Sequence, residues 1–237
     1  DVIPQVVKVI KKSKDRNNKI ILPKHCPTCK SPTIKEEDEA ILRCTNFHDC
    51  KDQIIGQLIH FSSKKSLNID GFGEKQIKQF YELKFIKKIE DIFSIQKYEK
   101  NIIALNGWGD LSFKNLIIAI NSSKNIDLDK FIFSLGIRYI GETISKLLAK
   151  EFANIEEFLK NTNNKERLLL IDGLGPKAIS SILNFFKREN NLYTVNKLVK
   201  IIKVNNFKKP DKLSFFTNKN IIFTGTLKKM SREESKY

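Results

Sequence analysis

Four cysteines, all within residues 26–50, offer the clearest chemistry in the sequence. Two residues separate Cys26 from Cys29, fourteen residues then lead to Cys44, and five more precede Cys50. Two such pairs on separate turns can bring four thiolates around a tetrahedral Zn²⁺ ion. Because four protein ligands leave no open coordination position, we expect this metal to be structural rather than catalytic.

Disulfide bonds are the other common use of cysteines. A small secreted protein would use them to staple much of its length, whereas no cysteine occurs outside residues 26–50, so zinc is the favoured interpretation. Two histidines are alternative ligands: His48 could replace Cys50, and His25 adjoins Cys26. A solvated surface side chain is the other interpretation of each.

Four short turns with glycines between apolar residues form a second pattern. The final glycine of each turn precedes a helix-like segment, and these glycines are 36, 32 and 34 residues apart. This near-constant spacing indicates four copies of a helix–turn–helix unit. The third copy has Tyr139 where the others have a first glycine. The glycines are Gly71 and Gly73, Gly107 and Gly109, Gly141, and Gly173 and Gly175.

The turns are suited to binding phosphate. Glycine permits a positive φ and lets another backbone approach closely. The following helix begins with unpaired amides at the positive end of its dipole, which favours anions. Lys75 and Lys177 stand two residues after their second glycines, and Arg138 can supply the charge in the third copy. Plain helix caps in a helical repeat are the alternative interpretation.

Contacts of this kind would bind the backbone of nucleic acid without reading its bases, and the affinity would depend strongly on salt. We expect a β-branched residue at Gly73 or Gly175 to weaken DNA binding more than alanine at Lys75 or Lys177. The reason is that glycine would supply the backbone geometry.

The composition agrees with a polyanionic partner. Lys and Arg number 43 against 27 Asp and Glu, a formal charge of +16, which favours nucleic acid. An anionic membrane surface is the alternative, but no single basic amphipathic helix carries the charge. With 41% hydrophobic residues the chain is not wholly disordered. No run approaches the roughly 18 apolar residues of a membrane-spanning helix.

The order of these features resembles the C-terminal portion of the bacterial NAD⁺-dependent DNA ligases. Residues 1–6 resemble the end of that family's oligonucleotide-binding (OB) barrel, the cysteine run its zinc finger, the four turns its helix-hairpin-helix domain, and residues 224–227 the opening of its BRCT domain. The resemblance implies a mainly α, multidomain chain with a short β segment, a four-cysteine zinc finger, four helix-hairpin-helix repeats and a truncated α/β start.

The implied domain boundaries follow the same order along the chain. They are the end of the OB fold at 1–24, the zinc finger at 25–53, the helix-hairpin-helix DNA-binding domain at 54–205, a linker at 206–216 and the start of BRCT at 217–237.

The resemblance also implies that catalysis and DNA binding lie on different domains. Enzymes of this family seal 3′-hydroxyl/5′-phosphate nicks in replication and repair, and their nucleophile is a lysine in a K-x-D-G motif on a separate adenylation domain. That motif is missing here, because Asp70-Gly71 and Asp172-Gly173 lack the lysine. Without that lysine we expect no catalytic or cofactor-binding residues in this chain. The chain begins with Asp1 rather than Met and ends at Tyr237 inside a helix-like segment, so we expect it to be an excised part of a longer protein.

The expected partner is nicked double-stranded DNA of any sequence, bound by a monomer in the bacterial cytoplasm at the nucleoid, with no membrane contact. NAD⁺ and Mg²⁺ would serve the absent catalytic domains. The main alternative is a stand-alone, non-catalytic helix-hairpin-helix repair protein. A basic scaffold for RNA is a third possibility, which the lack of aromatic-rich strands disfavours.

Overall fold

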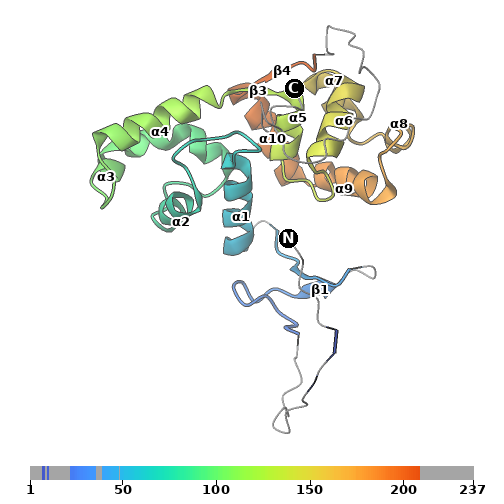
Figure 1. The fold of residues 1–237 in the computed structure, drawn as a ribbon, viewed down its shortest axis with the longest axis horizontal. Helices are drawn as coiled ribbons and strands as arrows, with labels where there is room; N and C mark the ends of the chain where they lie inside the picture. Colours follow the sequence, from blue (N-terminus) through green and yellow to red (C-terminus); the bar gives the residue numbers. More distant parts are fainter. Residues whose placement is uncertain (1–6, 9, 11–21, 36–38, 48, 209–237) are drawn as a thin grey trace.

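A computed structural model of the chain describes residues 7–8, 10, 22–35, 39–47 and 49–208 (Figure 1). Most of the expected end of the OB fold, most of the expected linker and all of the expected BRCT start lie outside these residues. The described part is mainly helical with short strands, as expected for residues 25–205.

The described elements run in the following order. They are β1 (Thr33–Lys35), β2 (Leu42–Cys44), α1 (Lys51–Ser62), α2 (Glu74–Glu82), the 3₁₀ helix η1 (Ile89–Tyr98), α3 (Glu99–Ile103), α4 (Asp110–Ser122), β3 (Asn125–Asp127), α5 (Leu128–Ser134), α6 (Glu142–Phe152), α7 (Ile155–Asn161), α8 (Lys165–Leu169), α9 (Pro176–Lys187), α10 (Glu189–Ile201) and β4 (Lys203–Asn205).

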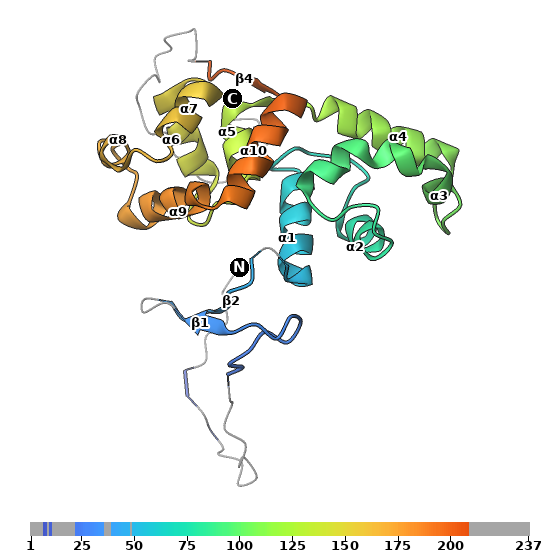
Figure 2. The same cartoon turned by 180° about the vertical axis from the view of Figure 1, so that it is seen from behind.

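The cysteine-bearing part is a small module beside a larger helical body, and α1 connects the two (Figures 1 and 2). In the small module β1 and β2 pair antiparallel, with Thr33 opposite Cys44. Cys50 is the N-cap of α1, and Ile55 on the same helix is buried in the core of the helical body. The expected boundary between residues 53 and 54 therefore lies inside one continuous helix.

One continuous apolar core runs through the helical body from Ile55 to Ile202. Its largest fully buried side chains include Phe61, Phe131 and Phe158. Helix α9 illustrates why these segments fold as helices, because Ala178, Ile179, Ile182 and Phe186 are its buried residues. Spacings of three and four residues place these side chains on one helical face.

A short parallel pairing of β3 with β4 joins the middle of the helical body to its C-terminal end, with Ile126 opposite Val204. The Lys203 amide also donates to the Lys124 carbonyl at 2.7 Å. None of the helices in the described part of the chain is long and apolar enough to cross a bilayer.

Candidate zinc centre and nucleic-acid interface

The four cysteines come together as the spacing predicted. All four Sγ atoms lie within 4.8 Å of one another, with 3.9 Å between Cys26 and Cys50 and 3.4 Å between Cys29 and Cys44. Tetrahedral coordination with Zn–S bonds of about 2.3 Å requires sulfur–sulfur separations of about 3.8 Å. The four cysteines are free thiols rather than disulfides, so the donor set fits a structural zinc ion.

Local backbone geometry presents these thiols to one point. Lys30 adopts a positive φ of 61° after the first pair, and its amide donates to the Cys26 carbonyl at 2.9 Å. In the second pair the Asn46 amide donates to Cys44 Sγ at 3.4 Å. Turns with amides directed at sulfur stabilise thiolates, the form that binds metal.

The thiols differ in acidity. Hydrogen bonds from the Ser31 side chain and backbone lower the pKa of Cys29 to about 6, whereas burial raises the pKa of Cys50. Crowded thiolates repel one another, and a bound cation removes that penalty. The metal-binding group found among the described residues does not include His25, which is exposed, and His48 lies outside them.

The four predicted turns share one backbone geometry. In each, the amide of the fourth residue donates to the carbonyl of the first at 3.0–3.2 Å. The third residue has a positive φ, which is 71° at Gly71, 82° at Gly107, 63° at Tyr139 and 83° at Gly173. The backbone of the turn therefore favours the first glycine of each pair.

The second glycine of each turn has a negative φ, unlike the first. It therefore does not supply the special backbone geometry that the sequence led us to expect. Gly73, Gly141 and Gly175 have φ values of −83°, −86° and −68°, and Gly109 is extended at −169°. Any residue can adopt these conformations, so backbone geometry does not require glycine there. An added Cβ meets open space at all of them except Gly73, where Gln76 Oε1 lies at an ordinary 3.6 Å.

Each second glycine is the N-cap of the following helix and offers no capping side chain. Helices α7 and α8, which do not follow such turns, are instead capped by Asn154 and Asn164, whose side chains accept from backbone amides at 2.8 and 3.0 Å. An N-terminus capped by glycine keeps its amides accessible to an outside anion, provided that nothing negative stands beside them.

The fourth turn differs from the other three in the charge of the first residues of the helix that follows it. Helices α2, α4 and α6 begin with Glu74, Asp110 and Glu142, which repel phosphate. Glu74 pairs with Lys78 at 2.5 Å and Glu142 with Lys65 at 2.6 Å. Helix α9 has no acid in its first turn and begins with Pro176 and Lys177. The fourth turn is therefore the most favourable anion site of the four.

The apolar residues of the turns pack inward. Ile69, Phe72, Ile137 and Ile140 are each at most 4% exposed. Trp108 in the second turn is partly buried against Phe80, with ring centroids 5.0 Å apart, and its Nε1–H donates to Gln79 Oε1. This supports a packing role for Trp108 rather than a stacking platform for bases.

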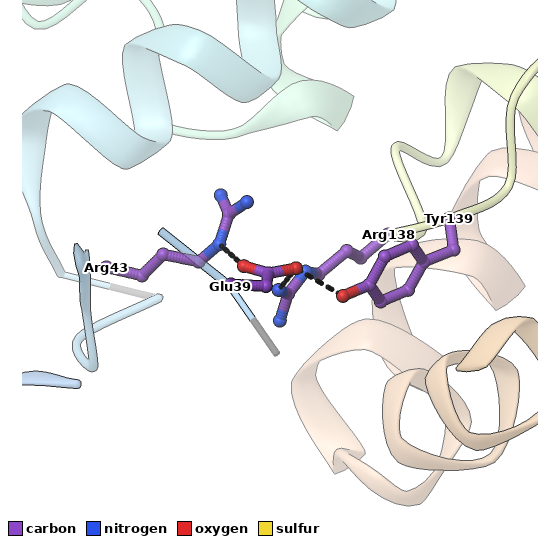
Figure 3. Close-up of polar contacts among 4 residues, drawn as sticks. All are labelled: Glu39, Arg43, Arg138 and Tyr139. Carbon is purple, nitrogen blue, oxygen red and sulfur yellow. Dashed lines mark hydrogen bonds and ion pairs between the residues drawn. The ribbon is translucent and has the colours of Figure 1, made fainter. Parts of the chain in front are cut away.

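Arg138 has a partner that the sequence did not reveal. It forms an ion pair with Glu39 of the cysteine module, and Arg43 Nε donates to the same carboxylate at 3.2 Å. The Tyr139 hydroxyl also donates to Glu39 (Figure 3). Arg188 of the helical body lies over the Phe47 ring at 4.4 Å, a second contact between the two parts. Phosphate binding by Arg138 remains a prediction.

The cysteine module and part of the helical body each match a known protein family. Residues 25–51 match the family described as the NAD-dependent DNA ligase C4 zinc finger domain, and residues 130–195 match the helix-hairpin-helix motif. The second match includes the third and fourth turns.

Curated relatives extend the similarity to the whole chain. It is 42% identical over 245 residues to a DNA ligase of Ehrlichia chaffeensis, 40% identical over 246 residues to one of Pelagibacter ubique, and 42% identical over 239 residues to one of Sulfurihydrogenibium azorense. All of this chain is covered in each case, against 36%, 36% and 33% of the relative. The chain thus spans about a third of the length of these proteins.

Proposed function

Because this chain is related over its whole length to part of the bacterial DNA ligases, we propose that it is the DNA-gripping segment of an NAD⁺-dependent DNA ligase. The observation that carries the proposal is the shared geometry of the four turns, each with a positive φ at its third residue and a glycine N-cap on the helix that follows. All four would act as helix-hairpin-helix units on duplex DNA.

Binding would use the sugar–phosphate backbone rather than the bases. Each turn would direct the amides of a helix start at a phosphate oxygen, and in the fourth turn Lys177 would stand next to them. Amides cannot distinguish one base pair from another, so duplexes of different sequence should bind alike. The charge of +16 strengthens binding to any of them.

The zinc ion would serve the fold rather than a reaction. Cys26, Cys29, Cys44 and Cys50 would hold it, and when bound it cross-links two turns and the start of α1 through four thiolates. Because Cys50 caps α1 and Ile55 of that helix is buried in the helical core, the module is oriented relative to the DNA-binding turns.

Nick sealing would belong to the whole ligase. The sequence holds no K-x-D-G lysine, so formation of lysyl-AMP and the steps that require NAD⁺ and Mg²⁺ would take place on other domains. This segment would hold the nicked duplex in place as a monomer at the bacterial nucleoid, which raises the effective concentration of the two DNA ends.

Binding to labelled nucleic acids tests the proposal. One phosphate per turn amounts to four contacts, for which the affinity should fall about 100-fold between 50 and 200 mM salt. Nicked duplexes of two unrelated sequences should bind equally, and structured RNA should bind more weakly. RNA binding as tight as duplex binding, or a strong preference for one sequence, would contradict the proposal.

A chimeric enzyme tests the part played in sealing. This chain would replace the matching third of the Ehrlichia chaffeensis ligase, and the chimera should seal a nicked duplex. The same chimera with Cys26→Ser and Cys29→Ser is the control, because loss of two zinc ligands should unfold the cysteine module and lower the rate of sealing while the four turns still bind DNA. A chimera that binds the nick but never seals it would favour a stand-alone binding protein.

A further inference from the structure

A cluster of basic and hydroxyl groups surrounds one carboxylate where the cysteine module meets the third turn. Glu39 accepts from Arg43 Nε at 3.2 Å, pairs with Arg138 and accepts from the Tyr139 hydroxyl. Figure 3 shows Arg43 reaching the carboxylate from one side and Arg138 and Tyr139 from the other. The Glu39 side chain is 15% exposed, against 38% for Arg43 and 30% for Arg138.

The chemistry of these donors suits a phosphate better than a carboxylate. Arg43 and Arg138 direct two guanidinium groups at the single Glu39 carboxylate. Guanidinium groups and a hydroxyl are the donors that bind the non-bridging oxygens of a phosphodiester. The Tyr139 hydroxyl, with Arg138 and Arg43, holds the pKa of Glu39 at about 2, so the carboxylate is an anion at neutral pH.

The backbone at Tyr139 supports a role in binding. Its φ of 63° is a conformation that bulky side chains rarely adopt and that glycine supplies in the other three turns. An unfavourable conformation of this kind is often retained where a side chain serves a binding site. Here it places a phenol hydroxyl at the point where the other turns have no side chain.

The same residues face a groove between the cysteine module and the helices α9 and α10. The groove has a volume of about 1020 Å³, and its lining includes Arg43, Arg138, Tyr139, Lys177 and Arg188. Among the described residues of its lining, Asp49 and Glu90 are the acidic ones, and Glu90 pairs with Lys88 at 3.1 Å. Basic side chains therefore outnumber acidic ones in the described lining, which extends from Arg138 to Lys177 at the start of α9.

We infer that Arg43, Arg138 and Tyr139 form a phosphate-binding site in which the Glu39 carboxylate stands in for a backbone phosphate of bound DNA. This inference rests on the proposed DNA-binding function. When DNA binds, a phosphate replaces Glu39 on the two guanidinium groups, and Glu39 becomes solvated. Glu39 thus competes with DNA, and the cysteine module contributes Arg43 directly to the grip.

Affinity for a labelled nicked duplex at fixed salt tests this inference in the full chain. Glu39→Gln removes the competing charge and should tighten binding about twofold to fivefold, the effect of one partly exposed ion pair. Glu151→Gln is the matched control, because Glu151 forms an ion pair with Arg167 and lies outside the groove lining, although its side chain is more exposed than that of Glu39. It corrects for the general gain in positive charge. In a background with both Arg43→Gln and Arg138→Gln, the effect of Glu39→Gln should shrink to that of the control.

A second measurement uses the unmodified chain, so its result does not depend on whether the variants fold. The NMR signal of the Arg43 Nε–H group should shift when duplex DNA is added, because a phosphate replaces its carboxylate partner. An unchanged signal with DNA bound, or Glu39→Gln binding no more tightly than Glu151→Gln, would overturn the inference and leave Glu39 as a structural cross-link. If the unmodified chain binds no DNA, the proposed function fails as well.

Discussion

Gly173 and Gly175 in the fourth turn are expected to have separable roles, and alanine at each position tests this directly. Gly173 has a φ of 83°, and a Cβ there would contact Leu147 Cδ2 at 3.5 Å. Gly175 has a φ of −68° and open space where a Cβ would be. Gly173→Ala should therefore damage the fold, and Gly175→Ala should damage only DNA binding.

The magnitudes follow from these two backbone conformations. A left-handed conformation costs an alanine about 1–2 kcal/mol, which lowers the Tm of a domain of this size by about 2–8 °C. At Gly175 an alanine restricts the unfolded chain, which stabilises the fold, and caps helix α9 less well than glycine, which destabilises it. The two effects offset each other, so the free energy of unfolding should change by no more than about 0.5 kcal/mol. A Cβ in the path of a phosphate should weaken binding about tenfold, the effect of losing one charged hydrogen bond.

Thermal unfolding and duplex affinity, measured on both variants and the unmodified chain, check these values. In the thermal-unfolding measurement, Gly107→Ala separates backbone strain from the contact with Leu147, because its φ is 82° and no atom lies within 4 Å of the added Cβ. If Gly173→Ala is as stable as Gly175→Ala, the turn does not need its positive φ. If Gly175→Ala binds duplex DNA as tightly as the unmodified chain, the helix amides do not hold the phosphate.

Three further predictions concern zinc, charge and packing. The purified chain should contain about one zinc ion. Chelation should remove the hydrogen-exchange protection of residues 25–53 while the core of the helical body stays protected. A zinc-free chain with intact protection of residues 25–53 would contradict this. Lys75→Ala and Lys177→Ala should each weaken binding to all duplexes equally and reduce the salt slope by about one, and a sequence-dependent loss would indicate base contacts instead. Phe61→Ala should lower stability by about 3–5 kcal/mol in chemical denaturation, because Phe61 is fully buried; a loss under about 1 kcal/mol would show that its site repacks.

The sequence predicted those features that depend on local geometry. Two residues between Cys26 and Cys29 set a tight turn that presents both thiols, so spacing alone indicated the metal cluster. Positive φ at the third turn position favours glycine, so the glycines marked the turns. Tyr139 shows the limit of that rule, because its φ of 63° meets the same requirement without glycine. The turn is defined by its backbone and not by its composition.

Features that depend on distant pairing could not be predicted. Glu39 and Tyr139 are 100 residues apart, and nothing local to either residue indicates the other. The pairing of β3 with β4 is equally hidden, because strands of three residues are too short to show an alternating pattern. The acids that begin α2, α4 and α6 were visible in the sequence. Their effect on phosphate became clear only when the structure placed them at the helix starts.

NMR mapping of backbone amides with and without a nicked duplex tests the central claim most directly. The largest shifts should fall at residues 73–76, 109–112, 141–144 and 173–178, with the fourth turn strongest, and they should be the same for duplexes of unrelated sequence. Shifts confined to other surfaces, with the amides of these four turns unchanged, would contradict the claim that helix starts hold the DNA backbone.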